Sequence, residues 1–228
     1  MLSRTVKDTL PHAHVVYNDY DHYTHRLAHI PQTNALLTHI RCIVAKEKRG
    51  QKLSESAKQS ICHYLRQREQ AGNFIDCLTL SASLLFSGKF AKNLDALCSN
   101  SMYNTVVQRE YNAEGYLDGL QVVHQDYRQV FQQYRDIPNV VFIADPPYLS
   151  TDKQSYKGYW GIAECLDVLH SLGDRFIYFT STKSEIVELA AWMDRTVGWS
   201  PFRDTQVEMR HNAVNGTCGY TDVMVFRG

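Results

Sequence analysis

The sequence predicts an α/β fold with a mixed sheet that ends in a C-terminal hairpin, and three stretches lead to this class. Residues 140–144 form an apolar run rich in β-branched side chains, which is typical of a strand covered on both faces. Residues 176–181 indicate a second buried strand. Residues 206–210 and 220–226 indicate two further strands, joined across an Asn-Gly pair that commonly makes a hairpin turn.

The N-terminal stretch predicts a helix, a strand and a second helix, in that order. The first helix covers residues 3–10 and ends at a proline, which interrupts helical hydrogen bonding. The strand covers residues 15–17, and residues 22–30 can be helical. An acid at the end of an early strand commonly binds ribose hydroxyls, which makes Asp19 a candidate cofactor-binding residue. For an isolated aspartate, the alternative of an acidic turn or helix cap is the more common one.

Residues 33–110 have a different character, since they are polar and helical in propensity and show no alternation of strands and helices. The apolar stretch 74–87 predicts the core of this region. Between Arg41 and Gln70, eight Lys or Arg residues stand against three Glu, in a protein whose 24 basic and 24 acidic residues cancel. This excess fits contact with a phosphate backbone as well as it fits a solvated helix face. The candidate nucleic-acid-binding residues are Lys46, Lys48, Arg49 and Lys52, with Lys89 in the basic link 88–93.

Two later stretches carry aromatic residues that could contact a base or a nucleoside. The predicted strand 120–123 leads to Asp126-Tyr127, where an acid and a ring could bond an adenine amine and stack on the base, although most such pairs are surface residues. The loop 149–160 is dense in aromatic side chains that could stack on bases, whereas single aromatic residues usually belong to a core. The loop's candidates are Tyr156, Tyr159 and Trp160.

Three helices are predicted between the later strands. Residues 130–135 indicate a short helix, and residues 162–172 indicate an amphipathic one. Residues 182–185 have the spacing of a capping box, which predicts that the third helix begins there and runs to about residue 195.

The main candidate site is the tetrapeptide Asp145-Pro146-Pro147-Tyr148, which follows the strand 140–144. Proline cannot donate to a sheet ladder, so the two prolines end the strand and stiffen the chain after it. Open α/β sheets bind their ligands at the carboxyl ends of strands, where this tetrapeptide stands.

These residue types suit a reaction at the exocyclic amine of a nucleobase. Such an amine is nearly planar with a delocalised lone pair, and acceptors on both of its hydrogens favour a tetrahedral, reactive nitrogen. The Asp145 carboxylate and the Pro146 carbonyl could accept these two hydrogen bonds from a rigid position. Tyr148 offers a face on which a base flipped out of a duplex could stack. No covalent nucleophile is required, and no metal ligands occur at a suitable spacing.

The composition argues against several other classes. No stretch of about 18 apolar residues occurs, so we expect no membrane span. The first residues lack the apolar region of a signal peptide. The six cysteines are scattered without a Cys-x-x-Cys pair, which predicts reduced thiols in a cytoplasmic protein rather than a disulfide framework or a zinc site.

The tetrapeptide Asp145 to Tyr148 resembles the catalytic motif of Dam-like DNA adenine methyltransferases, which use S-adenosylmethionine, and the order of the other parts is similar over essentially the whole chain. The resemblance implies a Rossmann-like methyltransferase sheet formed by residues 1–32 and 111–228. It implies that residues 33–110 are a helical target-recognition insert whose basic residues contact DNA. The cofactor-binding residues that it implies are Asp19, Asp126, Tyr127 and Asp145.

One departure from this family concerns the N-terminal end. Family members carry a strand and a Phe-x-Gly-x-Gly loop before the helix that matches residues 3–10, and no Gly-x-Gly occurs in this sequence. We therefore expect an N-terminally truncated sheet that binds S-adenosylmethionine weakly or not at all. A truncated reading frame is the favoured origin, and the alternatives are a gene remnant and an artificially shortened chain.

The resemblance predicts a bacterial or phage-encoded enzyme that methylates the N6 amine of adenine in double-stranded DNA, weakly active or inactive in this form. The alternatives are methylation of RNA or of the N4 amine of cytosine, and a non-catalytic DNA-binding remnant. A restriction endonuclease is a candidate partner by the same resemblance. The sequence predicts neither the recognition site nor the oligomeric state.

Overall fold

The computed structural model describes residues 2–86, 88–149, 160–215 and 218–228, without the side chains of 213–218. The chain divides into two compact units, Met1–His124 and Gln125–Gly228, which are described separately. Residues 1–32 and 111–124 therefore belong to the same compact unit as the helices of 33–110, whereas the sequence reading grouped 1–32 with 111–228. That assignment of a catalytic domain and an insert stays a prediction.

The first unit begins with a small α/β part. It contains α1 (Leu2–Thr9), β1 (Val15–Asn18), α2 (Tyr23–Ala28) and β2 (Leu120–Val123), and the two strands pair in parallel. Arg4 on α1 donates hydrogen bonds to the carbonyl oxygens of Gly115, at 3.2 Å, and Asp118, at 3.0 Å, in the turn before β2. The elements predicted at residues 3–10, 15–17 and 120–123 are confirmed.

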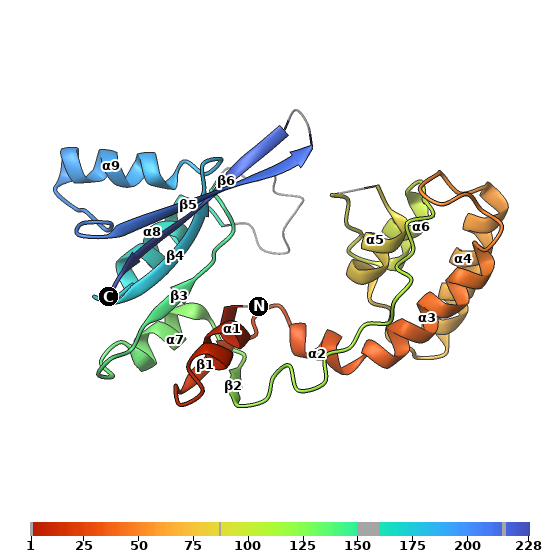
Figure 1. Cartoon of the computed structure of the whole chain (residues 1–228), viewed down its shortest axis with the longest axis horizontal. Coiled ribbons are helices and arrows are strands. Elements are labelled where there is room, and N and C mark those ends of the chain that lie inside the picture. The colour runs from red at the N-terminus through yellow and green to blue at the C-terminus, as the bar shows by residue number, and fades with distance from the viewer. Residues whose placement is uncertain (1, 87, 150–159, 216–217) are drawn as a thin grey trace. The chain divides into compact units, whose positions relative to one another are not determined.

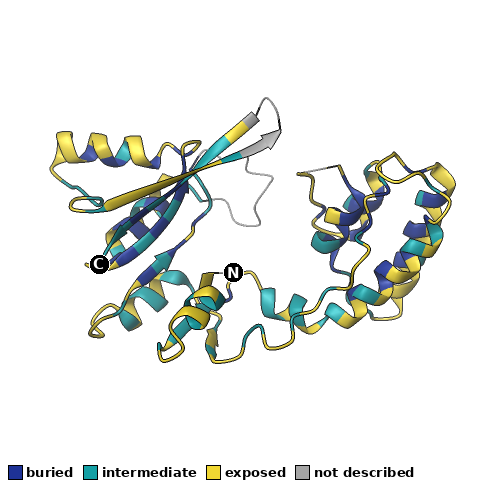
Figure 2. Ribbon diagram, viewed as in Figure 1, coloured by how far each residue is buried: buried dark blue, intermediate teal, exposed yellow. Residues whose placement is uncertain are grey.

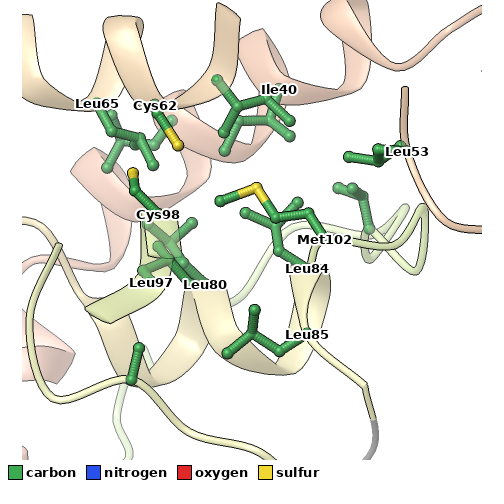
Figure 3. Packing of buried hydrophobic residues seen from close by; sticks show 14 of the residues in the cluster. Ile40, Leu53, Cys62, Leu65, Leu80, Leu84, Leu85, Leu97, Cys98 and Met102 are labelled. Atoms are coloured by element: carbon green, nitrogen blue, oxygen red, sulfur yellow. The ribbon is translucent and has the colours of Figure 1, made fainter. Parts of the chain in front are cut away.

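The rest of the first unit is helical. It contains α3 (Ile30–Ile43), α4 (Glu55–Gln70), α5 (Cys77–Leu84) and α6 (Leu94–Ser99), coloured orange to yellow-green in Figure 1. Leucine and isoleucine side chains from all four helices meet in one hydrophobic core, part of which is drawn in Figure 3. The prediction that the stretch 74–87 supplies core residues is confirmed by α5, in which Leu80 and Leu84 are fully buried.

The second unit carries a mixed four-stranded sheet in the order β3-β4-β6-β5. β3 (Phe142–Ala144) pairs in parallel with β4 (Phe176–Ser181), and β4 and β5 (Gln206–Asn215) each pair antiparallel with β6 (Cys218–Arg227). The predicted mixed sheet with a C-terminal pair of antiparallel strands is confirmed, whereas the turn at residues 216–217 lies outside the described residues. The helices of this unit are α7 (Tyr127–Tyr134), α8 (Ile162–Ser171) and α9 (Ile186–Val197).

The core of the second unit lies between the sheet and its helices (Figure 2). Val168 on α8 belongs to the same buried cluster as Phe176 and Tyr178 of β4. The ring of Phe131 on α7 meets Phe142 of β3 edge to face, with ring centroids 4.6 Å apart. β3 is less enclosed than predicted, because it has one neighbouring strand among the described residues. Consequently Ile143 is only half-buried.

The predicted capping box at residues 182–185 is wrong. The backbone of Thr182 extends the sheet, since its N–H donates to the carbonyl of Thr221 at 2.9 Å, so Thr182 is not the residue that caps a helix. α9 begins at Ile186, whose N–H donates to the Ser184 hydroxyl at 3.4 Å. In the same unit α7 begins at Tyr127, three residues earlier than predicted, because the Asp126 side chain caps it.

Among the residues that the structure describes, no helix combines the length and the apolar character needed to cross a membrane.

Candidate functional site

The tetrapeptide Asp145 to Tyr148 stands at the carboxyl end of β3, as predicted. Pro146 is buried, Tyr148 is half-buried, and the following residue, Leu149, belongs to the hydrophobic core of the second unit. Asp145 itself is exposed. The apolar residues therefore fix the backbone of this tip, while the carboxyl group remains accessible to a ligand.

The tip lies beside the end of β4, because the two strands are parallel and Ala144 stands opposite Tyr178. β4 ends in Thr180 and Ser181, which are both buried. The hydroxyl of Thr180 is buried without a hydrogen-bond partner among the described residues. A buried hydroxyl without a partner is uncommon in folded proteins, so this strand end retains unused hydrogen-bonding capacity.

A second carboxylate, Asp222 on β6, belongs to the same neighbourhood. It stands opposite Ser181 in the antiparallel pairing of β4 with β6. The side-chain amide of Asn212 on β5 donates a hydrogen bond of 2.6 Å to Asp222 and fixes its position. Sequence reasoning missed Asp222, although an acid inside an otherwise apolar strand is a signal that could have identified it.

The pKa of the Asp145 carboxyl is raised above its ordinary value. The main cause is desolvation by the surrounding protein, and the negative charge of Asp222 acts in the same direction. Both effects disfavour the carboxylate, so Asp145 holds a proton at a higher pH than an aspartate in water does. A ligand group that donates hydrogen bonds or carries positive charge would relieve this cost, which makes the tip a suitable place for an amine.

Asp126 and Tyr127 lie at the beginning of α7, in the same unit as Asp145. The Asp126 carboxylate accepts a hydrogen bond of 2.8 Å from the N–H of Arg128 and caps the helix, and its side chain remains 44% exposed. One carboxylate oxygen thus caps the helix, and the other lies 3.7 Å from the Arg128 guanidinium. Because a carboxylate has about four acceptor positions, the group can still accept a hydrogen bond from a ligand beside these two contacts.

Tyr127 is part of an aromatic cluster. Its ring lies against Trp160, with centroids 5.0 Å apart, and against Phe131, with centroids 6.1 Å apart. Its hydroxyl is buried with no hydrogen-bond partner among the described residues, and burial raises the pKa of this hydroxyl. Trp160, which was predicted to stack on a base, packs against the hydrophobic core of the second unit. This placement matches the alternative interpretation, in which a single aromatic residue belongs to a core. Tyr156 and Tyr159 lie outside the described residues.

Asp19 belongs to the first unit and is buried, at 3% exposure. One oxygen of its carboxylate accepts from the N–H of Tyr23, at 2.6 Å, and from the Tyr17 hydroxyl, at 3.0 Å. The other accepts from the N–H of Thr24, at 2.9 Å, and from the Thr24 hydroxyl. These bonds lower the pKa of Asp19 against the opposing effect of burial. Because a carboxylate has about four acceptor positions, this set leaves none for a ribose.

The four predicted basic residues of the helical region lie together in the connection between α3 and α4. Lys46, Lys48, Arg49 and Lys52 are all exposed. The connection is held against residues 102–104, since the N–H of Gly50 donates to the Asn104 carbonyl at 2.8 Å and the N–H of Leu53 to the Met102 carbonyl at 2.9 Å. Lys89, the fifth predicted residue, is exposed in the connection between α5 and α6.

The predicted site residues are thus divided between the two units. Asp145, Tyr148, Asp126 and Tyr127 belong to Gln125–Gly228. Asp19 and the basic residues belong to Met1–His124. The roles assigned to them in catalysis and binding stay predictions, and the carboxyl end of β3, with the end of β4 and Asp222, is the candidate site.

Comparison with known proteins shows the family to which this chain belongs. The chain is 31% identical, over 233 residues, to a Haemophilus influenzae protein named "Putative methyltransferase"; the match spans 100% of this chain and 78% of that protein. No protein-family model matches the chain, and no solved structure matches it. An acidic strand tip suited to an amine is consistent with a transferase of this kind. The chain belongs to the methyltransferases.

Proposed function

We propose that this methyltransferase moves a methyl group from S-adenosylmethionine to the N6 amine of adenine in double-stranded DNA. The observation that carries the proposal is the tetrapeptide Asp145-Pro146-Pro147-Tyr148 at the carboxyl end of β3. Its carboxyl is exposed, and its backbone is anchored by the buried Pro146 and by Leu149.

The tip supplies two acceptors for one amine. The Asp145 carboxylate accepts a hydrogen bond from one hydrogen of the adenine amine, and the Pro146 carbonyl accepts from the other. These bonds pull electron density onto the nitrogen and favour its tetrahedral form, which is the form that attacks a methyl group. Since both acceptors are held by the strand end, little reorganisation is needed when charge develops on the nitrogen. Tyr148 stacks on the base after it has left the duplex.

The residues of the second unit fit the methyl donor in part. When bound, S-adenosylmethionine supplies a methyl group activated by a positively charged sulfur. The pair of Asp145 and Asp222 provides negative charge that favours such a cation, and the exposed Asp126 carboxylate is suited to an amine or hydroxyl of the nucleoside. Asp19 fits less well, because its carboxylate already accepts four hydrogen bonds from its own chain.

The α3–α4 connection supplies a surface for the DNA backbone. Its four cationic side chains are exposed, and its backbone is tied to residues 102–104. Lysine and arginine side chains on a fixed backbone neutralise phosphates with a smaller loss of conformational freedom than the same residues on a loose tail.

The test is nucleoside analysis of DNA from cells that produce the chain. DNA is digested completely, and methylated nucleosides are measured by mass spectrometry against DNA from cells that produce the Asp145→Ala variant. We expect N6-methyladenine at a low level with the unaltered chain, since we expect it to bind S-adenosylmethionine weakly. The variant should lose at least about 100-fold of this level, the usual cost of removing one charge-stabilising group from an active site.

Other outcomes of this measurement identify the alternatives. N4-methylcytosine in DNA, or methylated nucleosides in RNA only, would assign a different acceptor to the same tip. Absence of every methylated nucleoside, with DNA binding retained, would contradict the enzymatic proposal and support a non-catalytic DNA-binding protein.

A further inference from the structure

Two cysteines of the helical region face each other across two helices. Cys62 lies on α4 and Cys98 on α6, and these helices pack together. Figure 3 shows the two sulfur atoms pointing toward one another at the edge of the hydrophobic core. Cys62 is 6% exposed and Cys98 is 9% exposed, so both residues are buried and nearly all of their surface is in contact with the protein.

The surroundings of this pair favour a thiolate on Cys62. The main effect is a hydrogen bond from the Cys98 thiol, which lowers the pKa of Cys62 to about 7 against the opposing effect of burial. Lys58 and Arg66 lie one helical turn before and after Cys62, and their charges act in the same direction as the hydrogen bond. The same bond raises the pKa of the donor, Cys98. A thiolate is the form of cysteine that reacts with oxidants.

Cys77 provides an internal comparison within the same core. It lies on α5, where burial and the charges of Glu69 and Asp76 raise its pKa to about 11. A thiol with this pKa is almost entirely protonated at neutral pH and reacts slowly. Burial thus raises the pKa of a cysteine in this core, whereas the facing thiol and the two cations lower the pKa of Cys62.

We propose that Cys62 and Cys98 are a redox-active pair that forms a reversible disulfide when the protein meets hydrogen peroxide. The Cys62 thiolate attacks one peroxide oxygen, the O–O bond breaks, and hydroxide leaves and takes up the proton released from the thiol. Cys98 then attacks the sulfur of the resulting sulfenic acid, the S–O bond breaks, and a second water leaves with the Cys98 proton. In sum, two thiols and one peroxide give one disulfide and two waters.

The disulfide would tie α4 to α6 and close a loop that contains α5. Such a link restricts the unfolded chain and so stabilises the folded helical region. Reduction by a dithiol reverses it through thiol–disulfide exchange. The proposal is independent of the methylated substrate, because it concerns only the core of the helical region.

The test is peptide mapping of the whole chain after treatment with hydrogen peroxide under native conditions. Free thiols are then blocked with iodoacetamide, and the protein is digested with trypsin. Cleavage after Lys58, Arg66 and Lys92 places the two cysteines on different peptides. We expect a linked peptide pair that contains Cys62 and Cys98 and disappears after dithiothreitol. A linked pair that forms only in denaturant, or oxidation of the exposed Cys42 without any linked pair, would overturn the proposal.

Thermal unfolding provides a second measurement with a matched control. Oxidation of the unaltered chain should raise the unfolding midpoint of the helical region by about 5–10 °C, and dithiothreitol should reverse the shift. Cys77→Ser should retain this redox-dependent shift, whereas Cys98→Ser should lose it. If Cys98→Ser does not fold, the test is whether oxidation raises the unfolding midpoint of Cys77→Ser and dithiothreitol lowers it again. A midpoint that oxidation leaves unchanged in Cys77→Ser or in the unaltered chain contradicts the proposal.

Discussion

The carboxyl group of Asp145 is subject to two opposing demands. In its proposed role as an acceptor for an amine it must be ionised, yet desolvation and the charge of Asp222 raise its pKa and favour the neutral form. Activity that needs the carboxylate is therefore lost as the pH falls through this raised pKa. The acid side of the pH dependence consequently depends on desolvation in the first place and on the charge of Asp222 in the second.

Replacing Asp222 by Asn should move the acid limb of the pH–rate profile to lower pH. The variant removes the charge that raises the pKa of Asp145, and asparagine keeps an oxygen that can accept from Asn212. The measurement is the rate of methyl incorporation into DNA between about pH 4 and 8. Asp194→Asn is the control, because Asp194 lies on α9 and pairs with Arg203 at 3.4 Å. If both variants leave the acid limb at the same pH as the unaltered chain, the charge of Asp222 does not raise the pKa of Asp145.

Asp19→Ala should destabilise the first unit by about 1–2 kcal/mol, the usual cost of losing a helix-capping carboxylate. The variant leaves the N–H groups of Tyr23 and Thr24 without their acceptor. Urea unfolding followed by circular dichroism measures the loss, with Asp21→Ala as the control, since Asp21 is exposed two residues further on. Unchanged stability, together with weaker binding of S-adenosylmethionine by calorimetry, would instead support the predicted contact with the cofactor's ribose.

At the scale of elements, the α3–α4 connection combines charge with a fixed backbone. The buried side chain of Asn104 donates to the carbonyl oxygen of Glu47 at 2.8 Å, and backbone bonds from Gly50 and Leu53 complete the attachment. Of the eight basic residues between Arg41 and Gln70, four lie in this turn-rich connection and four lie on α3 and α4. If these side chains contact phosphates, the affinity for DNA should fall as the salt concentration rises.

The triple variant Lys46→Ala, Lys48→Ala and Lys52→Ala should weaken DNA binding and flatten its dependence on salt. If each lysine neutralises one phosphate, the slope of log K against log salt concentration should fall in magnitude by about three. Fluorescence anisotropy with a labelled duplex measures this slope. Arg135→Ala with Arg195→Ala, two exposed residues of the other unit, provides the comparison. An unaltered slope in the triple variant would mean that these lysines are only a solvated surface.

At the scale of the whole molecule, the chain has two hydrophobic cores in two compact units. The first joins the four helices of the helical region, and the second joins the four-stranded sheet to α8 and its neighbours. Units that each bury a core of their own often unfold separately, so a single free energy of unfolding does not describe such a chain.

We expect two unfolding transitions that respond to different core substitutions. Leu65→Ala on α4 and Leu169→Ala on α8 each remove a buried leucine, and each should lower its own transition by about 2–5 kcal/mol. Urea unfolding monitored by hydrogen exchange assigns each transition to a unit. One common transition that both substitutions lower equally would show that the units fold as one.

Much of the local structure could be predicted because it depends on short-range patterns. The strand 176–181 follows from one run rich in aromatic and apolar residues, and the tip at Asp145 follows from the two prolines after a strand. The capping box at residues 182–185 failed for a tertiary reason, since Thr182 bonds to Thr221 on a neighbouring strand. The alternative role of Asp19 as a helix cap could be predicted from nearby sequence, because its partners Tyr23 and Thr24 lie only four and five residues further along the chain.

The sequence by itself determined the order of the elements outside residues 33–110, the mixed sheet with its C-terminal pair of strands, and the position of Asp145 at a strand end. Only the tertiary structure decided that Asp222 shares the surroundings of Asp145, and that Cys62 faces Cys98. The physical reason is that strand order and helix packing bring together residues far apart in the chain. No local pattern of hydrophobic spacing or turn residues records those contacts.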